Sequence, residues 1–285
     1  MITKFTEDMD IIAALDDLPN AVGGLTAAQL KAKFDEGGKA LKNYINNILT
    51  AELGAYSPPH IEKNWDFLHP INQRHVTTWQ SRANGIDCWT NDGGVCEITE
   101  DGLSLGDKGK ALQYFPFEAL EIGETYTLSV RLHAPIEHVA SGYSRRASIA
   151  LRLFLSAYAS QNTAVVYPAD ADENNMLSVT FVCPETTGQA RGIMIDGGKN
   201  FLTAPMVVEA VKLEKGSVST LHLDGRADPN IELWRCQQRV QVFADANLCP
   251  TNHLDFRPVM DADPIINTIT IDNVTYTVAS CEIPS

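Results

Sequence analysis

The sequence predicts a mainly β protein with an antiparallel β-sandwich at its centre. Several segments alternate apolar and polar residues with the period of a strand, most clearly 126–132, 147–155, 177–183, 193–195 and 207–213. Turn-forming residues separate these segments at short intervals, and no amphipathic helix lies between them. Short strands that follow one another in this way pair antiparallel and pack as two sheets.

A stiff linker separates the sandwich from the N-terminal part of the chain. The chain has 285 residues, which is longer than one average domain. Pro58 and Pro59 make the segment after residue 53 stiff, so residues 1–57 are predicted to be a separate helical segment. Within the sandwich, the segment between Gly94 and Thr125 is expected to be a long polar loop.

A helix is predicted to begin at Thr26. Thr26 and Gln29 have the spacing of a capping box, in which each side chain bonds to the backbone of the other residue. The apolar residues that follow share one stripe: Leu30, Phe34, Leu41, Tyr44, Ile45 and Ile48. The stripe packs either on the helix's own domain or in a short parallel bundle between identical subunits. The bundle would be formed by Leu30, Phe34, Leu41, Tyr44 and Ile48.

The C-terminal part is predicted to be small and rich in β-structure. Two alternating runs over residues 268–278 flank Asp272 and Asn273, which tolerate positive φ and so predict a two-residue hairpin. Residues 230–244 are expected to form a short helix or a strand. A hairpin this small is unstable alone, so symmetry copies are expected to cover it, in a homotrimer.

Composition disfavours several classes of partner. The net charge of −14 opposes nonspecific binding to nucleic acid, and no apolar segment is long enough for membrane insertion. The first residues lack the basic and apolar regions of a signal peptide, so synthesis without export is expected. The six cysteines contain no CxxC pair and are expected to be free buried thiols.

The candidate ligand-binding residues lie in the segment 64–89. Trp65, Trp79 and Trp89 have the aromatic faces on which a sugar ring stacks, and Trp79 lies in a polar run outside any apolar alternation. The side chains placed to bond to sugar hydroxyls are those of Asn72, Gln73, Arg74 and Asp87. In the alternative interpretation, the Trp residues belong to the core and the polar residues tie a loop to a strand.

No enzyme activity, cofactor or metal is expected. The sequence lacks an HExxH or nucleophile-elbow pattern, and its many carboxylates offer no way to select a catalytic pair. The acidic loop 170–175 concentrates oxygen ligands but lacks the spacing of an EF-hand, so a solvated loop is expected there, and a calcium site is the alternative.

Four motifs resemble one family. The runs Asn72-Gln73-Arg74, Ile86-Asp87-Cys88-Trp89, Gly-Glu-Thr-Tyr-Thr-Leu-Ser-Val over 123–130 and Leu-Trp-Arg-Cys-Gln-Gln-Arg over 233–239 resemble tail-fibre and receptor-binding proteins of phages and prophages. The resemblance covers roughly residues 60–245. The helix sequence that begins at Leu25 is similar to the N-terminal segment of many phage tail-associated proteins.

The resemblance implies a jelly-roll domain similar to carbohydrate-binding modules over residues 58–216, followed by a small β-rich tip domain over 217–285. It also implies a noncatalytic virion tail protein that forms homotrimers, docks to other tail or baseplate proteins through its N-terminal segment, and attaches the particle to host cell-surface glycan. The alternative is a carbohydrate-binding module of a secreted or tail-associated glycan-degrading enzyme.

Overall fold

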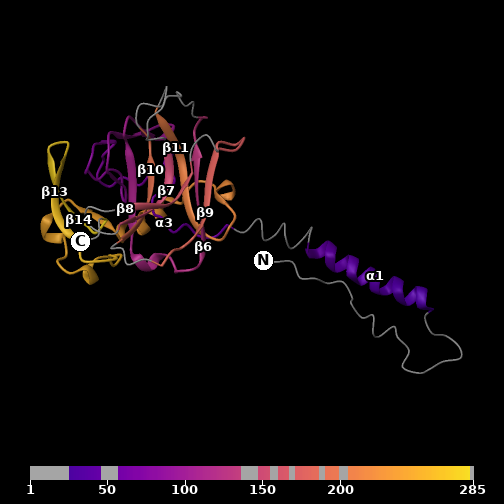
Figure 1. The fold of residues 1–285 in the computed structure, drawn as a ribbon. Helices are drawn as coiled ribbons and strands as arrows, with labels where there is room; N and C mark the ends of the chain where they lie inside the picture. Colours follow the sequence, from indigo (N-terminus) through magenta and orange to yellow (C-terminus); the bar gives the residue numbers. More distant parts are fainter. Residues whose placement is uncertain are drawn as a thin grey trace. The chain divides into compact units, whose positions relative to one another are not determined.

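A computed structural model describes residues 26–45, 57–135, 147–154, 160–166, 171–185, 190–198 and 205–282 (Figure 1). The chain forms two compact units, residues 1–57 and 58–285. The boundary between these two units falls where the linker was expected. The sandwich and the C-terminal segment belong to one unit, and the further division at residue 216 stays a prediction.

The described part of the first unit is the helix α1 (Ala27–Asn43). The capping box is confirmed, since the Gln29 amide donates to Thr26 Oγ1 at 3.3 Å and the Thr26 amide donates to Gln29 Oε1 at 2.8 Å. Among the residues that the structure describes, no helix has the length and apolarity needed to cross a membrane.

The apolar stripe of α1 is open in the single chain. Phe34 is 55% exposed, Leu41 42% and Ile45 44%. Leu30 and Tyr44 are half-buried. Ile48 lies outside the described residues, as does any continuation of the stripe. The stripe's use in a bundle between subunits therefore stays a prediction.

The second unit contains two antiparallel sheets. The six-stranded sheet has the order β1-β3-β4-β11-β6-β9, and the five-stranded sheet has the order β2-β5-β10-β7-β8. The strands of the first are β1 (Thr78–Trp79), β3 (Cys96–Thr99), β4 (Gly102–Leu105), β6 (Thr125–Leu132), β9 (Met176–Val182) and β11 (Met206–Lys215). The strands of the second are β2 (Thr90–Asn91), β5 (Lys110–Phe115), β7 (Ser148–Phe154), β8 (Ser160–Val166) and β10 (Ala190–Asp196).

The connections make this sandwich a jelly roll, which confirms the predicted fold class. From β4 onward the chain changes sheet at every connection except β7 to β8. Such crossing between two facing antiparallel sheets is the jelly-roll arrangement. Figure 1 shows β10, β7 and β8 in one layer and β11, β6 and β9 in the other.

The core lies between the two sheets. Leu128 and Val130 on β6 face it from one side, and Ile149, Leu151 and Ile193 face it from the other; each of these is at most 1% exposed. The predicted alternation of these strands is therefore confirmed. Four cysteines are buried, and none of the six forms a disulfide.

The predicted alternation of β11 is wrong in its first half. Val207 was expected to face the core, but Met206 and Val208 do so, because the pairing register with β6 shifts between Val208 and Ala210. This β-bulge adds one residue and changes the face on which the later side chains lie. Val211 therefore points inward, as predicted.

The expected polar loop before Thr125 is also wrong. The strands β3, β4 and β5 occupy this segment. Each is only four to six residues long. Tight turns at Gly102 (φ 119°) and Lys108 (φ 62°) separate them. When strands are this short, the two or three turn residues between neighbouring strands interrupt the alternation of apolar and polar residues. The alternation then cannot be recognised in the sequence.

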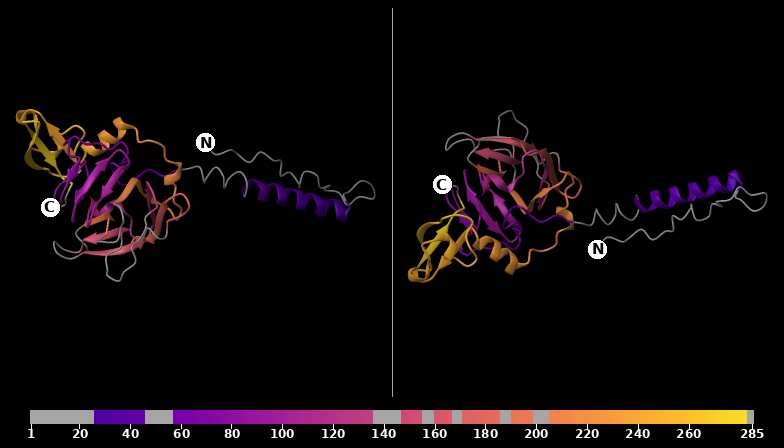
Figure 2. Two further views of the ribbon diagram at one scale, coloured as in Figure 1. Left: turned by 90° about the horizontal axis from the view of Figure 1, so that it is seen from above. Right: turned by 90° about the horizontal axis from the view of Figure 1, so that it is seen from below.

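The C-terminal segment folds as helical turns and a small sheet. Its helices are η4 (Leu221–Leu223), α3 (Pro229–Gln237), η5 (Ala246–Leu248) and η6 (His253–Asp255), and η2 (Phe117–Ala119) lies earlier, in the sandwich. Its strands are β12 (Val240–Phe243), β13 (Ile265–Ile271) and β14 (Val274–Ser280), in the order β12-β14-β13. The hairpin prediction is confirmed, with φ of 50° at Asp272 and 64° at Asn273. Figure 2 shows this segment, in yellow, against the first strands of the sandwich.

Candidate functional site

The three tryptophans expected to stack on sugar are buried. Trp65 is 6% exposed, Trp79 2% and Trp89 1%. The prediction that Trp79 offers an exposed face is wrong, because in β1 its neighbour Thr78 points to solvent while Trp79 points inward. A Cβ atom on Gly85 would come within 2.1 Å of the indole ring, so that residue must be glycine. The one tryptophan with an open face is Trp234, which is 54% exposed on α3.

The predicted hydrogen-bonding residues are also engaged inside the protein. Gln73 donates through its backbone and its side chain to the Asp87 carboxylate, at 3.1 and 2.7 Å. Arg74 makes a two-point ion pair with Glu282, with Nη1 at 2.9 Å from Oε1. Arg74 and Glu282 are 4% and 3% exposed. The interpretation that these residues tie a loop in place accounts for every contact.

Asn64 connects three separate segments. Its side chain donates to the carbonyls of Ile71 and Asp87 at 2.8 and 2.7 Å and accepts from the Ile71 amide at 2.8 Å. The Trp89 indole donates to its carbonyl at 2.9 Å. The Glu232 carboxylate on α3 accepts from its amide at 2.5 Å. We call the set Asn64, Gln73, Arg74, Asp87, Glu232 and Glu282 the motif network; all of its members except the half-buried Gln73 are buried.

The motif network joins the C-terminal segment to the sandwich and carries unusual electrostatics. Burial raises the pKa of the Asp87 carboxyl to about 7, against the smaller opposite effects of Gln73 and Arg74. Burial alone would lower the pKa of the Arg74 guanidinium, but the Glu282 carboxylate outweighs burial and raises it. The buried charge of Arg74 is therefore tolerated because its partner Glu282 comes from the far end of the chain.

We expect Glu282→Gln to destabilise the second unit by about 3 to 5 kcal/mol, because the buried Arg74 guanidinium then loses the carboxylate with which it is paired. Urea unfolding measures the change. Glu124→Gln, which breaks an exposed 3.3 Å pair with Lys215, is the control and leaves the midpoint unchanged. Replacing Arg74 and Glu282 together by Met should recover part of the loss. Equal stability of Glu282→Gln and wild type would contradict this account.

His60 is a cation whose side chain is only 10% exposed. Its ring stacks on Trp65 with centroids 4.1 Å apart, and its nitrogens lie 2.5 Å from Glu62 and 3.1 Å from Asp224. Burial lowers its pKa, but the two carboxylates outweigh burial and raise the pKa to about 9. His60 is therefore charged at neutral pH.

This shift predicts that stability falls with rising pH. The folded protein holds the His60 proton more tightly than the unfolded chain, so the stabilisation is complete below pH 6.5 and is lost as the pH rises to about 9. The size is on the order of 3 kcal/mol. Chemical unfolding across this window measures it, and His60→Gln should flatten the curve. A wild-type curve as flat as that of the variant would refute the role of His60.

Side chains that the sequence analysis missed gather on the outer face of the five-stranded sheet. Leu112, Ala150 and Met194 form a cluster separate from the main core. The strand register places Met194 opposite both others, so the three form a row across β5, β10 and β7. The sequence of β5 already indicated a second apolar face, because the apolar residues of this strand fall on both of its sides.

A second row lies next to this one. Tyr114 and Arg152 are both paired with Gly192, which lies between them on β10 and has no side chain. Two strand spacings put their Cα atoms about 10 Å apart. Arg152 Nη1 lies 3.6 Å from Asp92 Oδ2, and the Asp92 side chain is 49% exposed. We call Tyr114, Gly192, Arg152 and Asp92 the outer-face row.

The outer-face row combines an aromatic ring with both signs of charge. Tyr114 and Arg152 are half-buried. Burial raises the pKa of the Tyr114 hydroxyl, the nearby Asp92 carboxylate raises it further, and Arg152 partly offsets both. At neutral pH the row therefore offers a neutral phenol, a guanidinium and a carboxylate, which together donate and accept hydrogen bonds beside an aromatic face.

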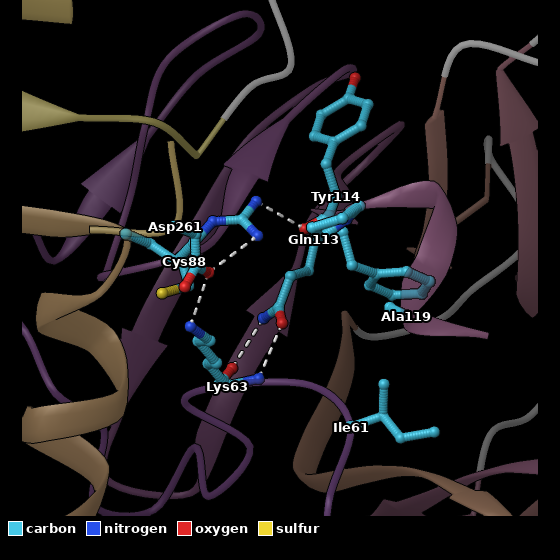
Figure 3. Close-up of a pocket in the computed structure, with 10 residues that line it drawn as sticks. Ile61, Lys63, Cys88, Gln113, Tyr114, Ala119 and Asp261 are labelled. Atoms are coloured by element: carbon cyan, nitrogen blue, oxygen red, sulfur yellow. Dashed lines mark hydrogen bonds and ion pairs between the residues drawn. The ribbon is translucent and has the colours of Figure 1, made fainter. Parts of the chain in front are cut away.

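A pocket of about 190 Å³ lies between β5 and the C-terminal segment (Figure 3). Lys63, Gln113, Arg239 and Asp261 line its polar side. Figure 3 shows that the Tyr114 ring points away from the Gln113 side chain, as expected for neighbours on a strand. Tyr114 therefore belongs to both: it lines the pocket, where its carbonyl accepts from Arg239 Nη2 at 3.0 Å, and its ring lies in the outer-face row on the other side of β5.

No metal centre emerges among the residues that the structure describes, in which no three His, Cys, Asp or Glu side chains could hold an ion. In the acidic loop 170–175, Asp172 Oδ1 accepts from the amides of Asn174 and Met176 at 2.8 and 2.9 Å. Asp172 therefore closes the turn before β9. Asp170 lies outside the described residues, and the expectation of no metal stays a prediction.

Several solved structures resemble part of this chain weakly. A structure described as "CBM4 structure and function" has 20% identity and a TM-score of 0.31, over 54% of this chain and 98% of that one. The "xylan-binding module CBM15" has 13% identity and a TM-score of 0.29, over 50% and 99%. The CBM22-1 and GH10 modules of a Clostridium thermocellum xylanase have 14% identity and a TM-score of 0.30, over 58% and 30%.

At these TM-scores the likenesses carry no argument about ligand or activity. No protein-family model matches the chain, and no curated protein matches it. The assignment as a jelly roll therefore rests on the strand order and the connections described above.

Proposed function

We propose that the jelly roll is a noncatalytic glycan-binding domain and that the outer-face row is its binding surface. The observation that carries this proposal is the register of Tyr114, Gly192 and Arg152 on three adjacent strands. A sugar ring stacks on an aromatic face and forms hydrogen bonds through its hydroxyls, so a site needs both kinds of group within the width of one ring.

The geometry supports each part of this proposal. Because Gly192 has no side chain, no residue of the outer-face row fills the space between Tyr114 and Arg152. Arg152 is held by a 3.1 Å contact from Nη1 to the Met194 sulfur and by its pair with Asp92, so little entropy is lost when it donates to a ligand. The carboxylate of Asp92 accepts hydrogen bonds from hydroxyls.

We expect Tyr114→Ala to weaken binding to a soluble polysaccharide about tenfold, or ~1.4 kcal/mol, because the stacking face is lost. Affinity gel electrophoresis in xylan, mixed-linkage β-glucan and bacterial lipopolysaccharide measures the effect. Tyr114→Phe should retain binding, because it keeps the ring.

Trp234→Ala is the matched control, since it removes an exposed aromatic side chain from α3, outside the outer-face row. It should bind as wild type does. Loss of binding in Trp234→Ala with retention in Tyr114→Ala would move the site to α3. Lack of retardation of the wild-type protein in all three gels would refute glycan binding of these types.

We further propose that the chain belongs to a phage or prophage-like tail, as a tail-fibre or receptor-binding protein attached to host cell-surface glycan. The motif resemblance supports this, together with a capped helix that precedes the sandwich and resembles the N-terminal segment of phage tail-associated proteins. In this proposal the N-terminal segment binds other tail or baseplate proteins, and the protein is located in the virion tail.

The homotrimer is part of the same proposal. The edge strand β13 pairs only with β14 among the described strands. Ile265, Ile266 and Val274 on this hairpin are 59%, 46% and 49% exposed. Native proteins normally cover or charge such an edge, and further copies of the chain would cover it.

Light scattering should give three times the chain mass for the full-length protein. Ile266→Lys should reduce this mass to that of a monomer, because it replaces an exposed apolar side chain of the proposed contact by a charge. Thr270→Lys adds the same charge at an exposed position on the same strand without removing an apolar side chain, and it should remain a trimer. A monomeric wild-type protein at micromolar concentration would exclude the trimer.

A further inference from the structure

Two buried cysteines meet where α3 packs on the sandwich. Cys236 on α3 is fully buried, and Cys88, which lies just before β2, is 5% exposed. The thiol of Cys236 shares a hydrogen bond with the thiol of Cys88. The two residues are far apart in the sequence, and every strand from β2 to β11 lies between them. A bond between these thiols would therefore join the sandwich to the C-terminal segment.

Hydrogen bonds around the two cysteines hold them in this position. Glu232 lies one helical turn before Cys236, on the same buried side of α3, and accepts from the Asn64 amide at 2.5 Å. The Asn64 side chain donates to the carbonyl of Asp87, the residue before Cys88, at 2.7 Å. The helix that carries Cys236 and the loop that carries Cys88 are therefore fixed against each other.

The backbone of Cys88 has an uncommon conformation. Its φ is 70°, in the left-handed region that glycine, asparagine and aspartate adopt most often. A residue held in this region persists only where its surroundings stabilise it, and here the Cys88 amide donates to Glu282 Oε1 at 2.6 Å. The backbone alone would favour glycine or asparagine at this position, so a cysteine there indicates a use for the thiol.

The two thiols are poorly placed to react once the protein has folded. Burial raises the pKa of the Cys236 thiol well above its usual range, and the neighbouring Cys88 raises it further. The thiolate is the form that reacts, and Cys236 is also closed to solvent. A bond between Cys88 and Cys236 must therefore form while the chain folds, before α3 is buried.

We propose that Cys88 and Cys236 form a disulfide when the chain folds in the presence of a small-molecule disulfide such as oxidised glutathione. One cysteine thiolate attacks the oxidant, releases one glutathione thiolate and leaves a mixed disulfide on the protein. The other cysteine thiolate attacks the protein sulfur of this mixed disulfide and releases the second glutathione. The two thiols lose two electrons and two protons, which oxidised glutathione gains. The link requires neither glycan binding nor trimer formation.

Refolding of the full chain from urea tests the proposal. The protein is diluted into reduced and oxidised glutathione, free thiols are trapped with N-ethylmaleimide, and the peptides are identified by mass spectrometry. We expect the peptides of Cys88 and Cys236 to be joined, and Cys249 and Cys281 to carry the label. Cys249 and Cys281 are the two most exposed cysteines, so their oxidation in a protein whose Cys88 and Cys236 are labelled would overturn the assignment.

The link should also raise the thermal midpoint by about 10 °C relative to the same protein in dithiothreitol, because it closes a long loop in the unfolded chain. Cys236→Ala should lose this difference, and Cys249→Ala is the matched control that keeps it. Each variant is compared with itself in the two buffers, so a change in stability caused by the substitution alone does not affect the comparison. An equal difference in Cys236→Ala and wild type would refute the proposal.

Discussion

The second unit depends on charges that are buried on one part of the chain and neutralised by another. Arg74 belongs to a loop before the first strand, and its counterion Glu282 follows the last strand, 208 residues later. Taking either charge out of water costs several kcal/mol unless the other is in place. The sandwich and the C-terminal segment therefore stabilise each other through the motif network, and each would expose an uncompensated charge without the other.

This dependence explains why the most conspicuous motifs are not ligand contacts. Gln73, Arg74 and Asp87 were predicted to contact a ligand because polar residues beside tryptophans are typical of sugar sites. Asp87 is fully buried, and Arg74 is 4% exposed. Each polar residue of a buried cluster must have a particular shape and particular hydrogen-bond partners. Such a cluster therefore places specific polar residues beside tryptophans in the sequence, as a sugar-binding site also does.

What the sequence predicted correctly was local. The capping box at Thr26, the turn at Asp272-Asn273 and the alternation of β6 each depend on residues within a few positions of one another. The bulge in β11 depends on pairing with β6, and the outer-face row depends on the register of three strands, neither of which a single stretch of sequence contains. Strands as short as β3 carry too few residues for alternation to stand out. The side chains of the adjacent residues Gln113 and Tyr114 lie in different sites only because they point to the two sides of β5.

The Arg74–Glu282 pair also affects folding during synthesis, because the ribosome makes Arg74 long before Glu282. Arg74 leaves the ribosome 208 residues before its counterion, which at ~5 to 20 residues per second is a delay of roughly 10 to 40 seconds. The last strand of the jelly roll, β11, ends at Lys215, which is still 67 residues before Glu282. Until Glu282 has been made, burial of the loop that carries Arg74 would leave its charge without this counterion. Chaperones that bind exposed apolar strands can act on the chain during this interval.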